Sequence, residues 1–508
     1  MTPKPMSTFE LQSGIVAAAL NSGRTVLDAG RGQPNWIALE PRAALFTLGH
    51  FAAAEALEAS PSPEWGTVPD HVGVAKRLID SVSGQQGGAL LTEAIEYCGR
   101  EFDYDPDALV HELLRGVLGV GYPAPPRMMP HVERIMQRYL LTAIGSPFAP
   151  TGSYHIFGTE GGAAGMAYLF RSLRENSLLG PGDKIAMATP VFTPYLQIPV
   201  LAGFGFDVVE LAAEGGAHRF GEEIFEGLRD PAVKAFFIIN PGNPDSRALP
   251  PARLAQLREL VTNDRPDLII VADTVYATFV EGFRGTMTEL PRNVITLHSF
   301  SKNFGATGTR VGFIAVHHDN VLDELLGKQD DATRAAQQVR YGSMTSDVTK
   351  LRFIDRLVAD SREVALHNIA GLATPGQVQM ALFALSYLLP RGRAYIDATR
   401  AELAGRLEAL ITPLGIPAEG GQDSFYYALI DLLEVAEAQR GPDFARRLME
   451  SVRPEDLAMR LASEHGVVVL PGVLFGAAGW DVRVSLASLS ADQLRAVGEA
   501  IVSVLTSA

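Results

Sequence analysis

The sequence predicts an α/β fold, with a large domain built on a mostly parallel sheet and a second, smaller α+β domain. From about residue 154 to residue 317, short apolar segments alternate with segments of helix length. The short segments are apolar almost throughout, which is typical of parallel strands with helices on both faces of the sheet. The expected strands are Lys184–Ala188, Phe206–Val209, Ala235–Ile239, Leu268–Ala272, Val294–His298 and Gly312–Val316. Ligands of such sheets bind beyond the carboxyl ends of the strands, so we expect functional residues there.

Helical patterns and weaker strands outline the rest of the chain. Helices are expected at Phe9–Ala19, Ala43–Ala56, Gly161–Asn176, Pro251–Thr262, Tyr395–Leu410 and Pro454–His465, and the stretch from 319 to 389 is largely helical. Shorter strands are expected at Ser424–Asp431, Val467–Leu470 and Val482–Leu486. We predict that residues 61–345 form the large domain and residues 346–508 the small domain, and that residues 1–60 pack on the small domain.

Composition limits the class of partner. The chain has 508 residues, of which 47% are hydrophobic and 20% charged, as in globular enzymes. Its net charge of −15 argues against nucleic acid as a partner, because phosphate backbones attract basic surfaces. Cys98 is the single cysteine, which excludes an intrachain disulfide and fits a reducing cytosol. Neither a signal peptide nor a membrane-spanning run is recognised, so we expect a cytoplasmic protein without membrane or metal partners.

The most informative segment runs from Ser299 to Gly312. Lys302 lies just after an expected strand, among small hydroxyl and glycine residues. A lysine in such a tight polar pocket can lose its proton by desolvation and attack an aldehyde. Arg310 then supplies a fixed positive charge for a phosphate. Pyridoxal 5'-phosphate (PLP) presents both groups. The alternative is an ordinary surface lysine. The S-x-x-K pattern of penicillin-binding enzymes is also present, but their S-D-N and K-T-G motifs are absent.

Two further strand ends carry residues that suit the same cofactor. Asp273 ends the strand Leu268–Ala272, and a carboxylate buried there needs a charged partner, such as the protonated pyridine nitrogen of PLP. Tyr276 follows three residues later and could bond the phenolate oxygen of the cofactor. The alternative for Asp273 is a cap of the next turn. Asn243 lies in Asn240-Pro241-Gly242-Asn243-Pro244, for which the alternative is a simple turn.

Three other features join this group. Glu160-Gly161-Gly162 opens a helix, and small residues there let backbone N–H groups approach a phosphate. Phe192 is an aromatic residue that either stacks on a cofactor ring or packs in the core. Arg483 lies in an alternating strand, where it either binds a substrate carboxylate or faces solvent.

Together these motifs resemble the PLP-dependent fold-type-I aminotransferase superfamily. The likeness rests on S-x-S-K-x-x-G-x-x-x-x-R-x-G around Lys302, on N-P-x-N-P around Asn243, and on the order of the motifs. It implies a sheet of the seven-stranded type. It implies that Lys302, Asp273 and Tyr276 are catalytic, and that Arg483 binds the substrate α-carboxylate. The implied cofactor-binding residues are Tyr122, Glu160, Gly161, Gly162, Phe192, Asn243, Asp273, Tyr276, Ser299, Ser301, Lys302 and Arg310.

Within the superfamily, the chain looks most like the aspartate 4-decarboxylases. The segments that carry this likeness are Asp28–Trp36, Tyr122-Pro123 with Arg127, Gly371–Pro375 with Gln377–Ala381, and Leu470-Pro471-Gly472. The likeness implies a β-decarboxylase with slow transaminase activity and an assembly of dimers. It also implies that Tyr122 reaches the phosphate of the neighbouring subunit and that Arg31 approaches the distal side of the substrate.

Two departures leave the substrate open. The resembled family has a lysine where this chain has Gln12, and a tryptophan where it has Thr309. A neutral Gln12 would tolerate a cationic substrate that a lysine would repel. The first hypothesis is therefore decarboxylation of L-aspartate to L-alanine. The alternative is elimination, replacement or C–C bond formation at Cβ or Cγ of a sulfonium amino acid such as S-adenosylmethionine. A non-catalytic scaffold has no need for Lys302, Asp273, Asn243 and Arg310 together.

Overall fold

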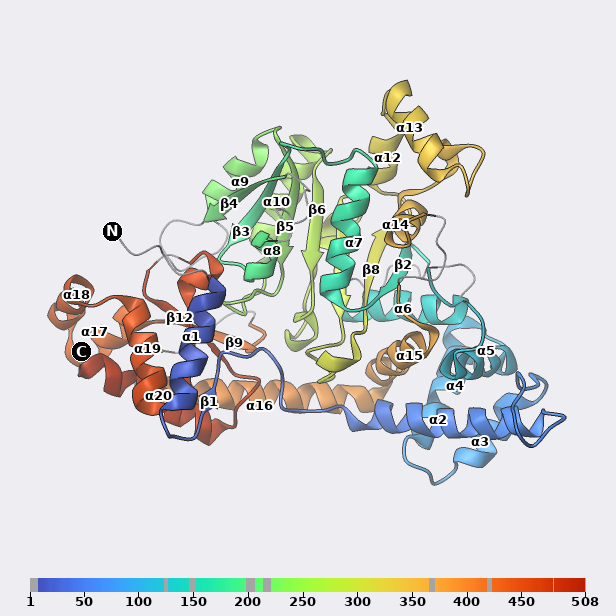
Figure 1. Cartoon of the computed structure of the whole chain (residues 1–508), viewed down its shortest axis with the longest axis horizontal. Coiled ribbons are helices and arrows are strands. Elements are labelled where there is room, and N and C mark those ends of the chain that lie inside the picture. Colours follow the sequence, from blue (N-terminus) through green and yellow to red (C-terminus); the bar gives the residue numbers. More distant parts are fainter. Residues whose placement is uncertain are drawn as a thin grey trace.

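A seven-stranded sheet lies at the centre of the computed structural model (Figure 1). The model describes residues 8–122, 127–145, 152–197, 206–212, 221–364, 371–417, 423–477 and 479–507. The strand order is β2-β8-β7-β6-β5-β3-β4. The strands are β2 (Tyr154–Thr159), β3 (Lys184–Thr189), β4 (Asp207–Ala212), β5 (Val233–Ile239), β6 (Ile269–Asp273), β7 (Val294–Ser299) and β8 (Gly312–His317). This architecture confirms the predicted α/β fold.

The sheet is parallel from β4 to β7, and β8 runs antiparallel to both of its neighbours, β7 and β2. All six strands expected from the sequence in this region are present, with shifts of up to three residues at their ends. The edge strand β2 was not among them. Its sequence, Tyr-His-Ile-Phe-Gly-Thr, interrupts the apolar run with a histidine and a glycine, so it lacks the pattern of the central strands.

Alternate residues of the strands enter two separate cores, one on each face of the sheet. Ala186, Phe236 and Ile270 belong to one core, whereas Ile185, Phe237 and Val271 belong to the other. This is why the strands are apolar at every position rather than at every second one. The helices that follow these strands are α7 (Gly162–Glu175), α8 (Thr193–Gln197), α9 (Glu222–Arg229), α10 (Pro251–Asn263), α11 (Thr286–Glu289), α12 (Val321–Gly327), α13 (Asp331–Tyr341) and α14 (Phe353–Ser361).

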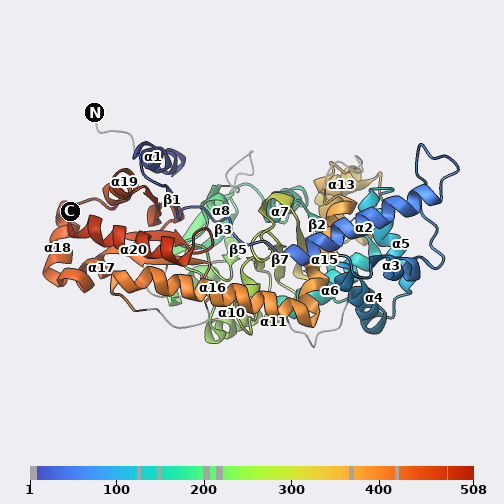
Figure 2. The ribbon, with the colours of Figure 1, turned by 90° about the horizontal axis from the view of Figure 1, so that it is seen from below.

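The N-terminal part of the chain lies at both ends of the molecule. Helix α1 (Thr8–Asn21) packs against α19, and β1 (Leu27–Asp28) pairs with β10 (Val467–Val468). Helix α2 (Leu39–Glu58) instead joins a helical group at the far end (Figures 1 and 2). The other members of that group are α3 (Val74–Val82), α4 (Gly88–Phe102), α5 (Pro106–Leu118), α6 (Pro130–Ala143) and α15 (Thr374–Leu388). Residues 8–58 therefore contact both ends, and the domain boundaries stay a prediction.

The C-terminal region forms a smaller α+β unit. Its antiparallel sheet has the order β11-β12-β9, with β9 (Tyr427–Asp431), β11 (Leu470–Pro471) and β12 (Asp481–Ser485). Its helices are α17 (Leu432–Arg440), α18 (Pro442–Ser451), α19 (Pro454–His465) and α20 (Ala491–Thr506). The long helix α16 (Pro390–Leu414) runs from this unit toward the helical group (Figure 2). The strand expected at Val467–Leu470 is in fact two short strands, β10 and β11, which pair with different partners.

Candidate active site

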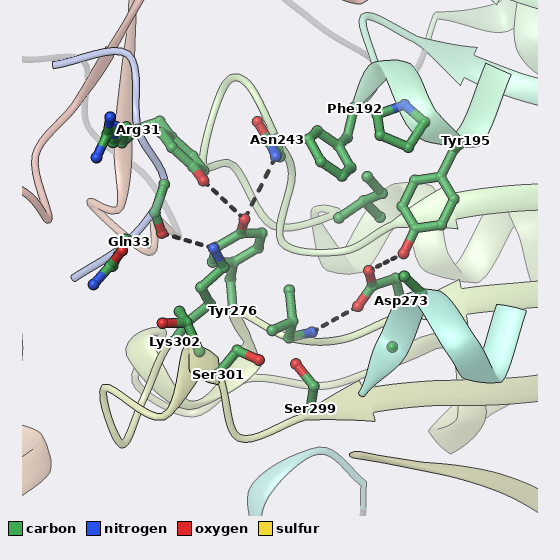
Figure 3. Close-up of a pocket in the computed structure, with 18 of the residues that line it drawn as sticks. Arg31, Gln33, Phe192, Tyr195, Asn243, Asp273, Tyr276, Ser299, Ser301 and Lys302 are labelled. Carbon is green, nitrogen blue, oxygen red and sulfur yellow. Dashed lines mark hydrogen bonds between the residues drawn. The ribbon is translucent and has the colours of Figure 1, made fainter. Parts of the chain in front are cut away.

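A cavity of about 830 Å³ lies between the carboxyl ends of β5, β6 and β7 and the smaller α+β unit. This is the edge at which ligands of parallel sheets are expected to bind. The structure brings most of the residues predicted from the sequence together there, and Figure 3 shows ten of the lining residues by name. The predicted residues that line it are Gln12, Arg31, Gly162, Phe192, Asn243, Asp273, Tyr276, Ser299, Ser301, Lys302, Arg310 and Arg483.

Lys302 projects into the cavity from the loop after β7. Its Nζ donates a hydrogen bond of 2.7 Å to the carbonyl oxygen of Gly32, and the Nζ lies 5.7 Å from the ring centre of Tyr426. The indole of Trp36 donates to the carbonyl oxygens of Lys302 and Asn303, at 3.2 and 3.1 Å. The N-terminal segment around Gly32 therefore holds both the amino group and the backbone of this lysine.

Asp273 is the last residue of β6, and its carboxylate accepts two hydrogen bonds (Figure 3). One comes from the Tyr195 hydroxyl, and the other from the Val275 N–H at 3.0 Å. Burial raises the pKa of Asp273, whereas the bonds from Tyr195 and Val275 and the charge of Lys302 lower it; the net shift is upward. The Val275 bond is the turn cap considered above. The same carboxyl group also lines the cavity, so it can contact a ligand as well as cap the turn.

The start of α7 and Arg310 form one end of the cavity. Gly161 has φ +87°, and a Cβ on it would lie 2.6 Å from Nη2 of Arg310, so only glycine lets the guanidinium approach the helix. Arg310 is exposed at the rim, and its Nη1 donates to the carbonyl oxygen of Thr307 at 3.0 Å. Backbone N–H groups of a helix start, beside an arginine, suit an anion such as phosphate. Glu160 accepts a hydrogen bond of 3.0 Å from Tyr168, and neither Glu160 nor Gly161 lines the cavity.

Arg483 lines the cavity from β12 and is buried rather than solvent-facing, with 3% of its surface exposed. Its Nη1 donates to Asn243 at 2.9 Å, and its Nη2 donates to the carbonyl oxygen of Gly30 at 2.6 Å. Its guanidinium lies 4.3 Å from the ring centre of Tyr427 and 4.6 Å from that of Phe475. Two aromatic faces and two fixed acceptors leave the guanidinium little freedom to rotate. Its Nε has no partner among the described residues, so donor capacity remains.

The mouth of the cavity holds the residues expected near the distal end of a substrate. Gln12 is exposed on α1, and Arg31 is 71% exposed and pairs with Asp28 at 2.8 Å. Tyr122 is 76% exposed and does not line the cavity of its own chain. The prolines that follow it lie outside the described residues. Its expected role in the neighbouring subunit stays a prediction.

Three contributions were missed by the sequence reasoning. Tyr195 bonds Asp273, and nothing in the spacing after Phe192 singles it out. Tyr427 lines the cavity from β9, where alternation alone does not distinguish it from its neighbour Tyr426. The carbonyl oxygens of Gly30 and Gly32 accept from Arg483 and Lys302, and backbone acceptors leave no mark in a sequence. The described ranges hold neither a cluster of three potential metal ligands nor a helix able to cross a membrane.

Comparisons with known proteins agree with this geometry. Residues 132–501 match the family aminotransferase class I and II. A relative from Pseudomonas sp, the bifunctional aspartate aminotransferase and L-aspartate beta-decarboxylase, is 40% identical over 508 residues, covering 98% of this chain and 95% of the relative. The chain belongs to the class I and II aminotransferase family. It is an enzyme of that family, whose members use PLP, and the resemblance seen in the sequence is confirmed.

More distant members share the fold. The aspartate/prephenate aminotransferase of Thermus thermophilus is 25% identical over 412 residues, covering 80% of this chain and 89% of that protein. The structure of the Thermus thermophilus aspartate aminotransferase with maleate superposes with a TM-score of 0.59 at 19% identity, covering 99% of this chain and 97% of that chain. The aromatic aminotransferase of Pyrococcus horikoshii gives a TM-score of 0.60 at 17% identity, covering 97% and 99%. At these identities the structures support the fold alone.

Proposed function

We propose that the cavity holds PLP. The chemistry of its side chains suits each part of that cofactor: the Lys302 amino group suits the aldehyde, and the Asp273 carboxylate suits the protonated ring nitrogen. The start of α7, the hydroxyls of Ser299 and Ser301 and the Arg310 guanidinium suit the phosphate. Phe192, 39% exposed at the cavity wall, is placed to cover a ring face.

We further propose that the enzyme converts L-aspartate to L-alanine and CO2 and transaminates as a side activity. The observation that carries this proposal is the convergence of Lys302, Asp273 and Arg483 on one cavity. These groups provide an amine, a carboxylate for the ring nitrogen and a carboxylate-binding guanidinium. The full-length similarity to the bifunctional Pseudomonas enzyme supports aspartate as the substrate.

Each residue then has a defined task. Arg483 binds the α-carboxylate through the side of its guanidinium not used by Asn243 and Gly30, which fixes the orientation of the substrate. Lys302 moves the proton at Cα, and Asp273 holds the proton on the ring nitrogen. Arg31 approaches the distal carboxylate at the mouth. When bound, PLP supplies an electron-withdrawing ring that weakens the bonds of the substrate carbons.

One observation favours a second candidate, which is a sulfonium amino acid processed at Cβ or Cγ. The exposed side chain of Gln12, which lines the cavity, is neutral and would not repel a cationic group. Arg31, already paired with Asp28, presents a partly neutralised charge to a cationic group.

Two parallel incubations test the proposal. The purified, PLP-loaded enzyme is mixed with L-aspartate labelled at its distal carboxyl carbon or with S-adenosylmethionine, and CO2, alanine and sulfonium loss are measured. Aspartate should yield CO2 and alanine in equal amounts. An enzyme that keeps its PLP spectrum but releases no CO2 from aspartate would rule out decarboxylation, and loss of the sulfonium compound would then establish the second candidate.

The assembly and location follow as proposals from the same family membership. We propose a homodimer or a higher oligomer of dimers, in which Tyr122 of one subunit completes the phosphate site of the next. The 76% exposed position of Tyr122 outside its own cavity supports this arrangement. A cytoplasmic location is supported by the lone Cys98, which is buried as a free thiol.

A further inference from the structure

Tyr427 lines the cavity, and none of the roles proposed above involves it. It lies on β9, and its backbone N–H donates to Oγ of Ser246 at 2.7 Å. Its hydroxyl and the Lys302 amino group are close together: a Cβ built on Gly32 would lie 2.3 Å from the Tyr427 oxygen and 3.2 Å from Lys302 Nζ. The Tyr427 phenol is therefore a polar group beside the lysine. Both groups occupy space that any side chain at position 32 larger than that of glycine would fill.

A chain of hydrogen bonds, fixed in direction as far as Tyr276, leads to this phenol. Arg483 can only donate, so the Asn243 oxygen at 2.9 Å must face it and the Asn243 amino group must face Tyr276. That amino group lies 3.5 Å from the Tyr276 oxygen (Figure 3), and the Tyr276 oxygen lies 3.1 Å from the Tyr427 oxygen. Either phenol can donate to the other; Tyr276 receives the Asn243 amino group, and it can give its own proton to Tyr427. This order stabilises negative charge on the Tyr427 oxygen.

The charges around Tyr427 act in the same sense. The facing groups are Lys302 after β7, Arg483 on β12, Tyr276 after β6 and Tyr426 on the same strand. Burial raises the pKa of Tyr427, but Lys302, Arg483 and the Tyr276 hydrogen bond lower it, and the net shift is downward. In contrast, burial raises the pKa of Tyr276 and of Tyr426. Of the three adjacent phenols, Tyr427 is the one that releases its proton most readily.

We propose that Tyr427 is a second acid–base group of this site, which gives and takes the proton at Cβ of the substrate while Lys302 serves Cα. The proposal deepens the decarboxylase assignment and rests on it. The bond from Cβ to the distal carboxyl carbon breaks, CO2 leaves and the electron pair stays at Cβ. The Tyr427 proton joins that pair to form a C–H bond. The phenolate left behind accepts a hydrogen bond from Tyr276 and is reprotonated from solvent.

A titration without cofactor or substrate tests whether the Tyr427 phenol has a lowered pKa. The apoenzyme is titrated from neutral to alkaline pH while the absorbance of tyrosinate is followed, and Tyr427→Phe is compared with the wild type. The control is Tyr104→Phe, which loses a hydroxyl that donates to the His131 carbonyl oxygen at 3.3 Å, and burial raises the pKa of that tyrosine. The lowest-pH tyrosine transition should be absent only from Tyr427→Phe. A transition that persists in this variant overturns the proposal.

An exchange experiment then tests the role at carbon. PLP-loaded wild type, Tyr427→Phe and Tyr104→Phe are incubated with L-alanine in D2O, and deuterium entry at Cα and Cβ is measured by NMR. In Tyr427→Phe, exchange at Cβ should fall by about 10²- to 10⁴-fold while exchange at Cα stays within about threefold, since a missing acid–base group costs that much at its own step. An equal fall at both carbons would show that Tyr427 only positions the site, and an unchanged Cβ rate would also refute the proposal.

The two proposals fail in different ways. If the wild type exchanges both carbons of alanine but releases no CO2 from aspartate, the decarboxylase assignment is wrong, whereas selective loss of Cβ exchange in Tyr427→Phe still supports the acid–base role. If the wild type releases CO2 and Tyr427→Phe does so at the same rate, the decarboxylase assignment holds and the role of Tyr427 is wrong.

Discussion

In the Tyr195→Phe variant, PLP affinity should begin to decline at a higher pH than in the wild type as the solution is made acidic. Tyr195 is 5% exposed, and its hydroxyl donates to the Asp273 carboxylate, so Tyr195→Phe keeps the buried ring and removes one hydrogen bond. Hydrogen bonds to charged groups contribute about 1.5–3 kcal/mol, and one pKa unit corresponds to about 1.4 kcal/mol. The pKa of Asp273 in the apoenzyme should therefore rise by about 1–2 units.

The sign of the effect follows from the charge that PLP needs. Asp273 can hold the protonated ring nitrogen only as a carboxylate, so PLP affinity falls as the pH drops through the pKa of this group. Burial already raises that pKa, and loss of the Tyr195 bond raises it further. The acid-side decline of affinity should therefore begin about 1–2 pH units higher in Tyr195→Phe.

The assay is a PLP titration of the apoenzyme at a series of pH values, followed by the cofactor absorbance. Tyr104→Phe serves again as the control, because it removes a tyrosine hydroxyl in the helical group of α2–α6 and α15 and should leave the curve unchanged. A pH profile of Tyr195→Phe that coincides with the wild type would refute the reasoning. It would mean that Tyr195 does not stabilise the Asp273 carboxylate, or that this carboxylate does not control PLP affinity.

Three further predictions concern the substrate and the assembly. Because Gln12 is exposed, Gln12→Lys should lower KM for aspartate by at most about fivefold, and high salt should remove the effect; a cationic substrate would instead bind more weakly. Arg483→Lys should raise KM for aspartate by about 10- to 100-fold, because a bidentate contact becomes a single charged one, and an unchanged KM would exclude Arg483 from carboxylate binding. Light scattering of the PLP-loaded enzyme at micromolar concentration should give a dimer or larger, and a fully active monomer would contradict the role of Tyr122.

The sequence predicted the parts of the site that follow from strand order. Asp273 ends β6, and Asn243 and Lys302 follow β5 and β7. These are neighbouring parallel strands, so their carboxyl ends bring the three residues to one edge of the sheet. A motif placed directly after an apolar strand is therefore informative about position as well as chemistry. The family resemblance supplied what strand order could not, above all the match of Arg483.

Contacts between distant segments could not be predicted in this way. Tyr195 reaches Asp273, which is 78 residues away, and Lys302 donates to Gly32, which is 270 residues away. Such contacts depend on how the N-terminal segment and the smaller α+β unit dock on the sheet, and no local pattern encodes that docking. Helices α1 and α2 pack at opposite ends of the molecule for the same reason. The apolar pattern of a helix shows that it packs on something, but it does not show on which surface.

Borohydride reduction tests the position of the cofactor most directly. The PLP-loaded enzyme is reduced, digested and analysed by mass spectrometry to find the lysine that carries the cofactor. The cavity geometry predicts that the modified peptide contains Lys302, and that Lys302→Ala gives no modified peptide. A cofactor mapped to any other lysine would show that Lys302 is not the residue that binds PLP.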